Sequence, residues 1–171
     1  GSKNIEAVRS AFSELQGLKF SAEQIVRIAS HGGGSKNIEA VQSAFEALQG
    51  LGFDAEKIVR MVSNNGGSKN IEAVRSAFSE LQGLGFDADQ IVRMVSHIGG
   101  SKNIEAVQSA FEALERLGFD AEKIARVAGQ NGGSQNIEAV LSAFEALQGR
   151  KFSTEQIVRI ASHGGGSKNI E

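Results

Sequence analysis

The 171-residue chain contains no cysteine, proline, tryptophan or tyrosine. Without cysteine it can form neither a disulfide nor a thiolate-ligated metal site. No apolar run approaches the roughly 18 residues that a membrane-spanning helix needs. The first residues also lack the basic start, apolar stretch and cleavage site of a signal peptide. These absences exclude disulfide scaffolds and transmembrane proteins, and they predict a cytoplasmic protein as the default.

An excess of basic charge is missing as well. The 18 lysines and arginines are outnumbered by 20 aspartates and glutamates, so the formal net charge is −2. A nucleic-acid-binding domain usually carries a basic patch and often has a high pI, so the total charge argues mildly against this class. Phosphate contact depends on where the charges lie rather than on their sum. Net charge alone therefore does not decide the function.

The chain does have a strong internal repeat. Phenylalanines recur every 33 residues, at Phe20, Phe53, Phe86, Phe119 and Phe152. A period between 20 and 50 residues is typical of solenoids and other repeat arrays. The single array 1–171 then divides into a trailing half-repeat, four full repeats and a leading half-repeat. Their ranges are 1–19, 20–52, 53–85, 86–118, 119–151 and 152–171.

Each repeat has the pattern of two helices joined by a glycine loop. The first helix is predicted from about Ser21 to Ser30, because Ser21 and Gln24 have the spacing of a capping box. The second is predicted to start at Ser35, and its apolar residues recur with the 3.6-residue period of an amphipathic helix. It ends near Gly50. No segment alternates like a strand, so we expect an all-α solenoid of helical hairpins.

Between the two helices, each repeat carries two differing residues, here called the variable pair, followed by Gly-Gly. The pairs are His31-Gly32, Asn64-Asn65, His97-Ile98, Gln130-Asn131 and His163-Gly164. The second residue of the pair changes from Gly to Asn to Ile. A turn that needs a positive φ would not accept this range, because a β-branched residue is strongly disfavoured there. The variation indicates a position selected for what it touches.

The residues after the pair predict an anion site. Gly33, Gly34 and Ser35 lead into a helix N-terminus, where free N–H groups and the macrodipole favour negative charge. The positive charge of Lys36 lies in the first turn, where the positive end of the helix dipole repels it. A bound anion would offset this repulsion. Stacked repeats would form a row of such sites, and a nucleic-acid backbone is a row of phosphates. The predicted phosphate contacts are Gly33, Gly34, Lys36, Gly66, Gly67, Lys69, Gly99, Gly100, Lys102, Gly132, Gly133, Gln135, Gly165, Gly166 and Lys168.

The repeat from Phe20 to the Gly-Gly-Ser after His31-Gly32 resembles the repeats of transcription activator-like effectors. Across the whole chain, the 33-residue units are most similar to the divergent bacterial and marine-metagenome TALE-like repeats. This resemblance implies a right-handed superhelix that follows the DNA major groove and reads one base per repeat. It implies double-stranded DNA as the partner, with no catalysis, cofactor, metal, membrane or small-molecule substrate. The expected location is a bacterial nucleoid, or a host nucleus if the protein is an effector.

The resemblance also implies a role for each residue of the variable pair. The first residue would brace the loop within its own repeat, at His31, Asn64, His97, Gln130 and His163. The second would specify the base, at Gly32, Asn65, Ile98, Asn131 and Gly164. Glycine leaves room for a thymine methyl, asparagine can donate to a purine N7, and isoleucine suits adenine. The expected target is 5′-T-(G/A)-A-(G/A)-T-3′.

Several other readings compete with these roles. The three histidines stand in separate repeats without convergent ligands, which disfavours a metal site. The Gly-rich loops lack P-loop spacing, and the phenylalanine column has the helical spacing of a core. Arginines that could touch phosphates are more simply a solvated helix face; they are Arg27, Arg60, Arg93, Arg126 and Arg159. A protein-binding or self-assembling scaffold remains the alternative function, and the uncapped ends predict head-to-tail association.

Overall fold

A computed structural model describes residues 2–30, 32–63, 66–163 and 166–170. All regular secondary structure in these segments is helical, which confirms the all-α prediction. Five long helices are α1 (Ser2–Gly17), α3 (Ser35–Gly50), α5 (Ser68–Gly83), α7 (Ser101–Arg116) and α9 (Gly133–Gly149). Five short ones are α2 (Ala22–Ser30), α4 (Ala55–Val62), α6 (Ala88–Val95), α8 (Ala121–Ala128) and α10 (Thr154–Ala161), and the 3-10 helix η1 (Gly166–Asn169) follows. None of the helices in the described segments is long and apolar enough to span a bilayer.

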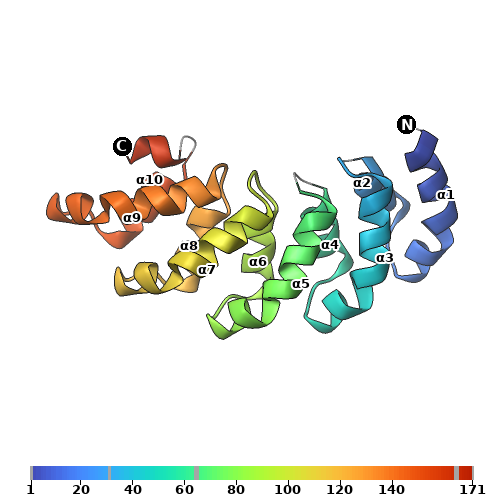
Figure 1. The fold of residues 1–171 in the computed structure, drawn as a ribbon, viewed down its shortest axis with the longest axis horizontal. Coiled ribbons are helices and arrows are strands. Elements are labelled where there is room, and N and C mark those ends of the chain that lie inside the picture. Colours follow the sequence, from blue (N-terminus) through green and yellow to red (C-terminus); the bar gives the residue numbers. More distant parts are fainter. Residues whose placement is uncertain (1, 31, 64–65, 164–165, 171) are drawn as a thin grey trace.

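The helices pack in sequence order as two parallel layers. Each long helix contacts the next long helix, each short helix contacts the next short one, and neighbours in the chain also touch. The result is a curved row with the two termini at opposite ends, along which the long helices gradually change direction (Figure 1). The connections that lead from a short helix to the following long helix lie along one edge of this row. The fold therefore collects the described residues of the variable pairs on one side of the molecule.

Paired phenylalanines link the two layers within each repeat. The ring of Phe20, just before α2, meets Phe45 of α3 edge-on, with 5.2 Å between ring centroids. The same contact recurs at 5.5 Å between Phe53 and Phe78, and Phe53 is completely buried. Edge-to-face aromatic pairs add to the stabilisation that burial of the rings provides. These phenylalanines belong to the core, as their helical spacing predicts.

The short helices begin at side-chain caps, as the sequence predicts. Ser153 and Gln156 form a complete capping box at α10. The Asp54 carboxylate accepts a hydrogen bond from the Lys57 backbone N–H at 2.8 Å, and this bond is the main reason that the pKa of Asp54 is lowered. At Asp120 the pKa is also lowered, first by the Lys123 side chain and then by the Lys123 backbone N–H. Both caps are therefore strongest when the aspartate is ionised.

Replacing one of these caps should give a pH-dependent loss of stability. We expect Asp120→Ala to lower the free energy of unfolding by about 1 kcal/mol near neutral pH. The pKa of Asp120 lies below its usual 3.8. Its charge therefore stabilises the fold above that value, and the contribution is lost as the pH falls through the folded-state pKa. Urea unfolding of both proteins from neutral pH downward would measure this shrinking difference.

The matched control for this cap is Asp120→Ser, because a serine caps α10 at the equivalent position, Ser153. A serine cap does not titrate, so this variant should keep most of the stability across the pH range. A cost of Asp120→Ala that is the same in acid and at neutral pH would contradict the electrostatic part of the cap.

Candidate functional site

The candidate site is the set of loops that join each short helix to the next long one, called here the loop row. Together with the first helical residues after each loop, it comprises the described residues within 30–36, 63–69, 96–102, 129–135 and 162–168. These residues follow the upper edge of the molecule in Figure 1. Because each loop sits between helices packed on their neighbours in sequence order, the loops follow one another along that edge. This arrangement makes an extended partner geometrically possible.

The second residue of the variable pair is exposed wherever the structure describes it. Ile98 is 54% exposed although it is large and apolar, and Asn131 is also exposed. A Cβ added to Gly32 would meet no atom within 4 Å, and neither Gly32 nor Ile98 has a positive φ. The backbone therefore accepts any side chain at this position and leaves it open to solvent. Asn65 and Gly164 lie outside the described residues.

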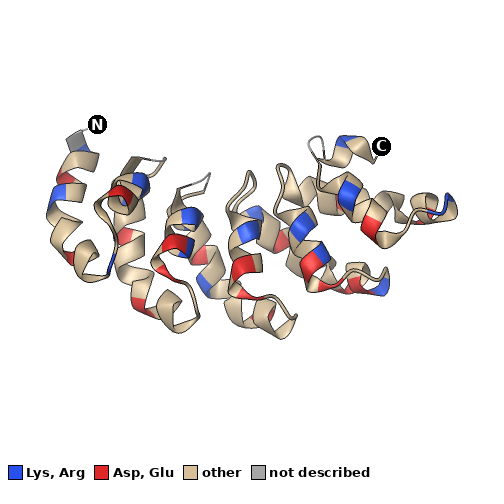
Figure 2. Ribbon diagram, turned by 180° about the vertical axis from the view of Figure 1, so that it is seen from behind, with Lys and Arg blue, Asp and Glu red and all other residues tan. Residues whose placement is uncertain are grey.

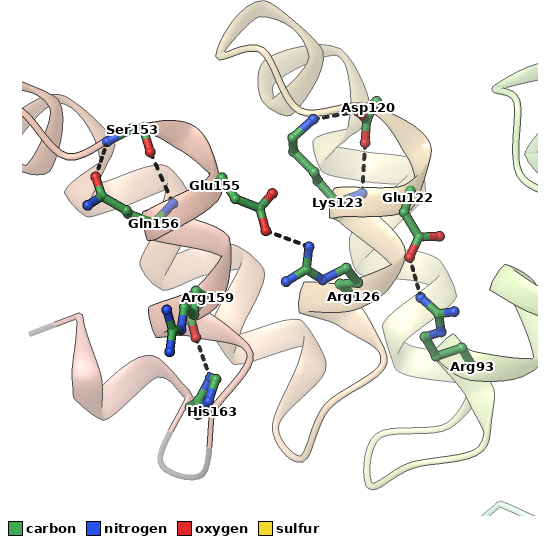
Figure 3. A network of polar contacts seen from close by, with 10 residues as sticks. All are labelled: Arg93, Asp120, Glu122, Lys123, Arg126, Ser153, Glu155, Gln156, Arg159 and His163. Carbon is green, nitrogen blue, oxygen red and sulfur yellow. Dashed lines mark hydrogen bonds and ion pairs between the residues drawn. The ribbon is translucent and has the colours of Figure 1, made fainter.

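The first residue of the pair behaves differently from loop to loop. The Nδ1 atom of His163 lies 2.7 Å from the carbonyl oxygen of Arg159, one turn back in its own repeat (Figure 3). The side chains of His97 and Gln130 make no hydrogen bond within the described part of the chain, although they were expected to brace their loops. His31 and Asn64 fall outside that part. Bracing in the loops of His97 and Gln130 must come from another residue.

A buried asparagine in the first turn of the long helices α3, α5, α7 and α9 supplies that bracing. Asn37, Asn70, Asn103 and Asn136 are completely buried. The Asn103 Nδ2 group donates to the carbonyl oxygen of Met94 at 2.8 Å and to that of Ile98 at 3.4 Å. A side-chain amide suits this task because it carries two N–H donors as well as an acceptor oxygen.

These asparagines were not predicted from the sequence, although the sequence contains a signal for them. The residue stands at the same position in every repeat, and Asn103 precedes the buried Val107 by one helical turn. Residues four apart lie on the same helix face. An invariant polar residue on the apolar stripe therefore indicates a buried hydrogen-bonding group, because a polar group is rarely buried without partners.

Glycines in several of the described loops are needed to make room for the asparagine amides. A Cβ on Gly99 would come within 2.3 Å of the Asn103 Oδ1 atom, and one on Gly67 within 2.4 Å of the Asn37 Oδ1 atom. The φ angles of these two glycines, 113° and 49°, also disfavour other residues. Internal packing is therefore sufficient to explain Gly-Gly, and close approach to a phosphate is not required.

The expectation of free backbone N–H groups at the helix N-termini that follow the loops is wrong for Lys69, Ser134 and Ser167. The Ser134 N–H donates to Asn103 Oδ1 at 3.0 Å, and the Ser167 N–H donates to Asn136 Oδ1 at 2.8 Å. The Lys69 N–H donates to the Gly66 carbonyl oxygen at 3.0 Å. Sequence cannot reveal this, because the acceptor of each serine amide comes from the preceding repeat.

The fourth loop departs from the other described loops. Its helix α9 starts at Gly133, one residue earlier than the pattern, and Gly132 has a left-handed backbone with φ 79°. The Asn136 N–H then donates to the Gly132 carbonyl oxygen at 2.8 Å. This loop begins at Gly129, which replaces the serine of the other repeats. The backbone that follows its variable pair, Gln130-Asn131, therefore has a different conformation from that of the other described loops.

The lysines of the loop row are available to an anion. Lys36, Lys69, Lys102 and Lys168 are exposed, as is Gln135 in the equivalent place, and the four lysines form no ion pair with any described residue. On each short helix the arginine of the last turn lies nearer the loop edge than the acidic residue of the first turn does (Figure 2). The arginine end of each short helix therefore faces the loop row. Gly165 lies outside the described residues.

Three arginines of the short helices, Arg27, Arg93 and Arg126, pair with a glutamate of the next short helix. Arg93 pairs with Glu122 at 2.7 Å, and this guanidinium is the main cause of the lowered pKa of Glu122. Arg126 pairs with Glu155 at 2.7 Å (Figure 3). These contacts connect successive short helices, so such arginines are more than a solvated face. They are less suited to phosphate than the lysines because their charge is already partly neutralised.

Within the described residues, no three His, Asp or Glu side chains gather as a metal site would require. No protein-family model matches the chain, and no curated protein matches it.

Proposed function

We propose that this chain is a right-handed superhelical solenoid of 33-residue TALE-like repeats that binds double-stranded DNA selectively through the major groove. The proposal rests chiefly on the second residue of the variable pair. This residue is exposed and sterically unconstrained in the described loops, and it changes from Gly to Asn to Ile while the surrounding framework is nearly constant. Variation confined to an exposed, aligned position is what one-base-per-repeat reading needs.

The exposed residues suit the edges of bases in the major groove. Ile98 offers an apolar surface, and Asn131 offers an amide donor to a purine N7. Gly32 leaves open space that a thymine methyl can occupy. With Asn65 and Gly164 read in the same way, the proposed target remains 5′-T-(G/A)-A-(G/A)-T-3′.

Phosphate contact is assigned to the lysine side chains. The described long-helix amides Lys69 N–H and Ser134 N–H are already satisfied inside the protein, so they have little left to offer an external anion. Lys36, Lys69, Lys102 and Lys168 are exposed beside the loops. Contacts to phosphates position a protein on the duplex without reading sequence. The proposed interface thus separates base reading by the variable pairs from phosphate binding by the lysines.

Binding to short duplexes tests this function. At low salt we expect the chain to prefer a duplex that contains the proposed target, with each mismatched base pair costing about 1 to 3 kcal/mol. The measurement is a fluorescence-anisotropy titration with duplexes permuted one position at a time. The matched variant Ile98→Gly should move the preference at the central position from adenine to thymine. Equal affinity for every duplex would exclude sequence reading, and a flat salt dependence would favour the scaffold alternative.

A further inference from the structure

Three of the buried asparagines, Asn37, Asn103 and Asn136, each contact two successive loops. Asn103 donates to the Ile98 carbonyl oxygen in its own loop, and it accepts the Ser134 N–H of the following loop at 3.0 Å. Asn136 repeats this arrangement: it donates to the Asn131 carbonyl oxygen at 3.3 Å and accepts the Ser167 N–H at 2.8 Å. At these three positions a single rigid amide group therefore joins one loop to the next.

Packing around the amide reinforces the same connection. A Cβ on Gly99, in the loop of the same repeat, would collide with the Oδ1 atom of Asn103. A Cβ on Gly133, in the following loop, would lie 2.8 Å from the Cγ atom of Asn103. The two glycines belong to consecutive loops. The amide is thus enclosed by backbone from both loops, and a shift of one loop must displace the asparagine or the other loop. Neighbouring loops follow each other along one edge of the molecule (Figure 1).

We infer that Asn37, Asn103 and Asn136 are positioning residues that set the placement of each loop relative to the next. This inference rests on the proposed function in one respect, because base discrimination at the Gln130-Asn131 loop then depends on two asparagines, Asn136 of its own repeat and Asn103 of the preceding one. The variable pairs are read as a coupled row instead of as independent loops. Loss of Asn103 should therefore disturb the loops of His97-Ile98 and Gln130-Asn131 together.

Hydrogen exchange tests the coupling without any DNA. In Asn103→Ala we expect backbone amides of residues 97–100 and the Ser134 amide to exchange about tenfold faster, since their local anchor is gone. Amides of more distant loops, such as that of Ser35, should keep their rates. The control is Val107→Ala, which removes buried packing one turn further along the same helix and should not act selectively on these two loops. An increase confined to residues 97–100 would overturn the coupling.

Base discrimination tests the consequence for reading. For wild type we expect about tenfold preference at each of the third and fourth positions of the target. In Asn103→Ala both preferences should fall toward onefold, while the first position and the salt dependence stay unchanged. In Asn136→Ala the affected positions should move to the fourth and fifth. Loss at the third position alone, or equal losses at all positions in Asn103→Ala, would overturn the inference.

The two arms separate the possible failures. If wild type discriminates between no duplexes, the proposed function fails, the claim about reading falls with it, and the exchange rates alone decide whether the asparagines couple the loops. If wild type discriminates and Asn103→Ala discriminates equally well, the DNA-reading function stands and the positioning role is wrong.

Discussion

Gly133→Ala is expected to lower the free energy of unfolding by about 3 kcal/mol, within the upper range for an overpacked site. The added Cβ would lie 2.0 Å from the carbonyl oxygen of Ala128 and 2.8 Å from the Cγ atom of Asn103. The first neighbour is backbone and the second is completely buried, so neither can move aside cheaply. Urea unfolding followed by helical circular dichroism would measure the change.

The matched control lies at the other end of the same helix, α9. A Cβ on Gly149 would meet no atom within 4 Å, and Arg116 already occupies the equivalent position in α7. Gly149→Ala should therefore be neutral or stabilise the protein by up to about 1 kcal/mol, as alanine favours the helix over glycine. If the two alanine variants unfold at the same urea concentration, the tight packing of the loop glycines is refuted.

Removing the lysines of the loop row should nearly abolish duplex binding. The variant carries Lys36→Gln, Lys69→Gln, Lys102→Gln and Lys168→Gln, and Gln135 shows that the fold accepts glutamine at this position. Each lost phosphate contact reduces the slope of log K against log salt by about 0.9, so four contacts should weaken binding about a thousandfold near 0.1 M salt. Anisotropy titrations over a range of salt concentrations provide the slope.

A second charge variant separates local contact from total charge. It replaces Lys19, Arg116, Arg150 and Lys151 with glutamine. All four are exposed, and they stand at or beside the turns that lead from a long helix to the next short helix, away from the loop row. The net charge changes by the same amount in both variants. The control should keep the wild-type salt slope, and an equal loss of binding in the two variants would show that only overall charge matters.

Much of the fold could be predicted from local patterns. The capping box at Ser21 and Gln24 forms as its spacing predicts, with the Ser21 N–H donating to the Gln24 Oε1 atom at 2.9 Å. The start of the long helix at Ser35 is also confirmed. These features depend on residues within one or two turns of each other, so a single repeat contains the information needed to predict them.

The candidate site was predictable only in part. Exposure of Ile98 agrees with its position in a variable loop, yet the loop of His97 is braced by Asn103 and not by His97. The early start of α9 at Gly133 was also not anticipated. The acceptors that the Asn103 amide reaches depend on the folded path of the loop, and residue spacing alone does not rank them.

By itself the sequence determined the repeat period, the helical class, the caps and the variable pair, because periodicity and capping act over short distances along one chain. Tertiary structure decided which polar groups remain free. The Ser134 N–H is satisfied by an asparagine 31 residues earlier in the chain, and Arg93 by a glutamate 29 residues later. Such partners meet only when neighbouring repeats stack, so their hydrogen bonds depend on the distance and angle between repeats.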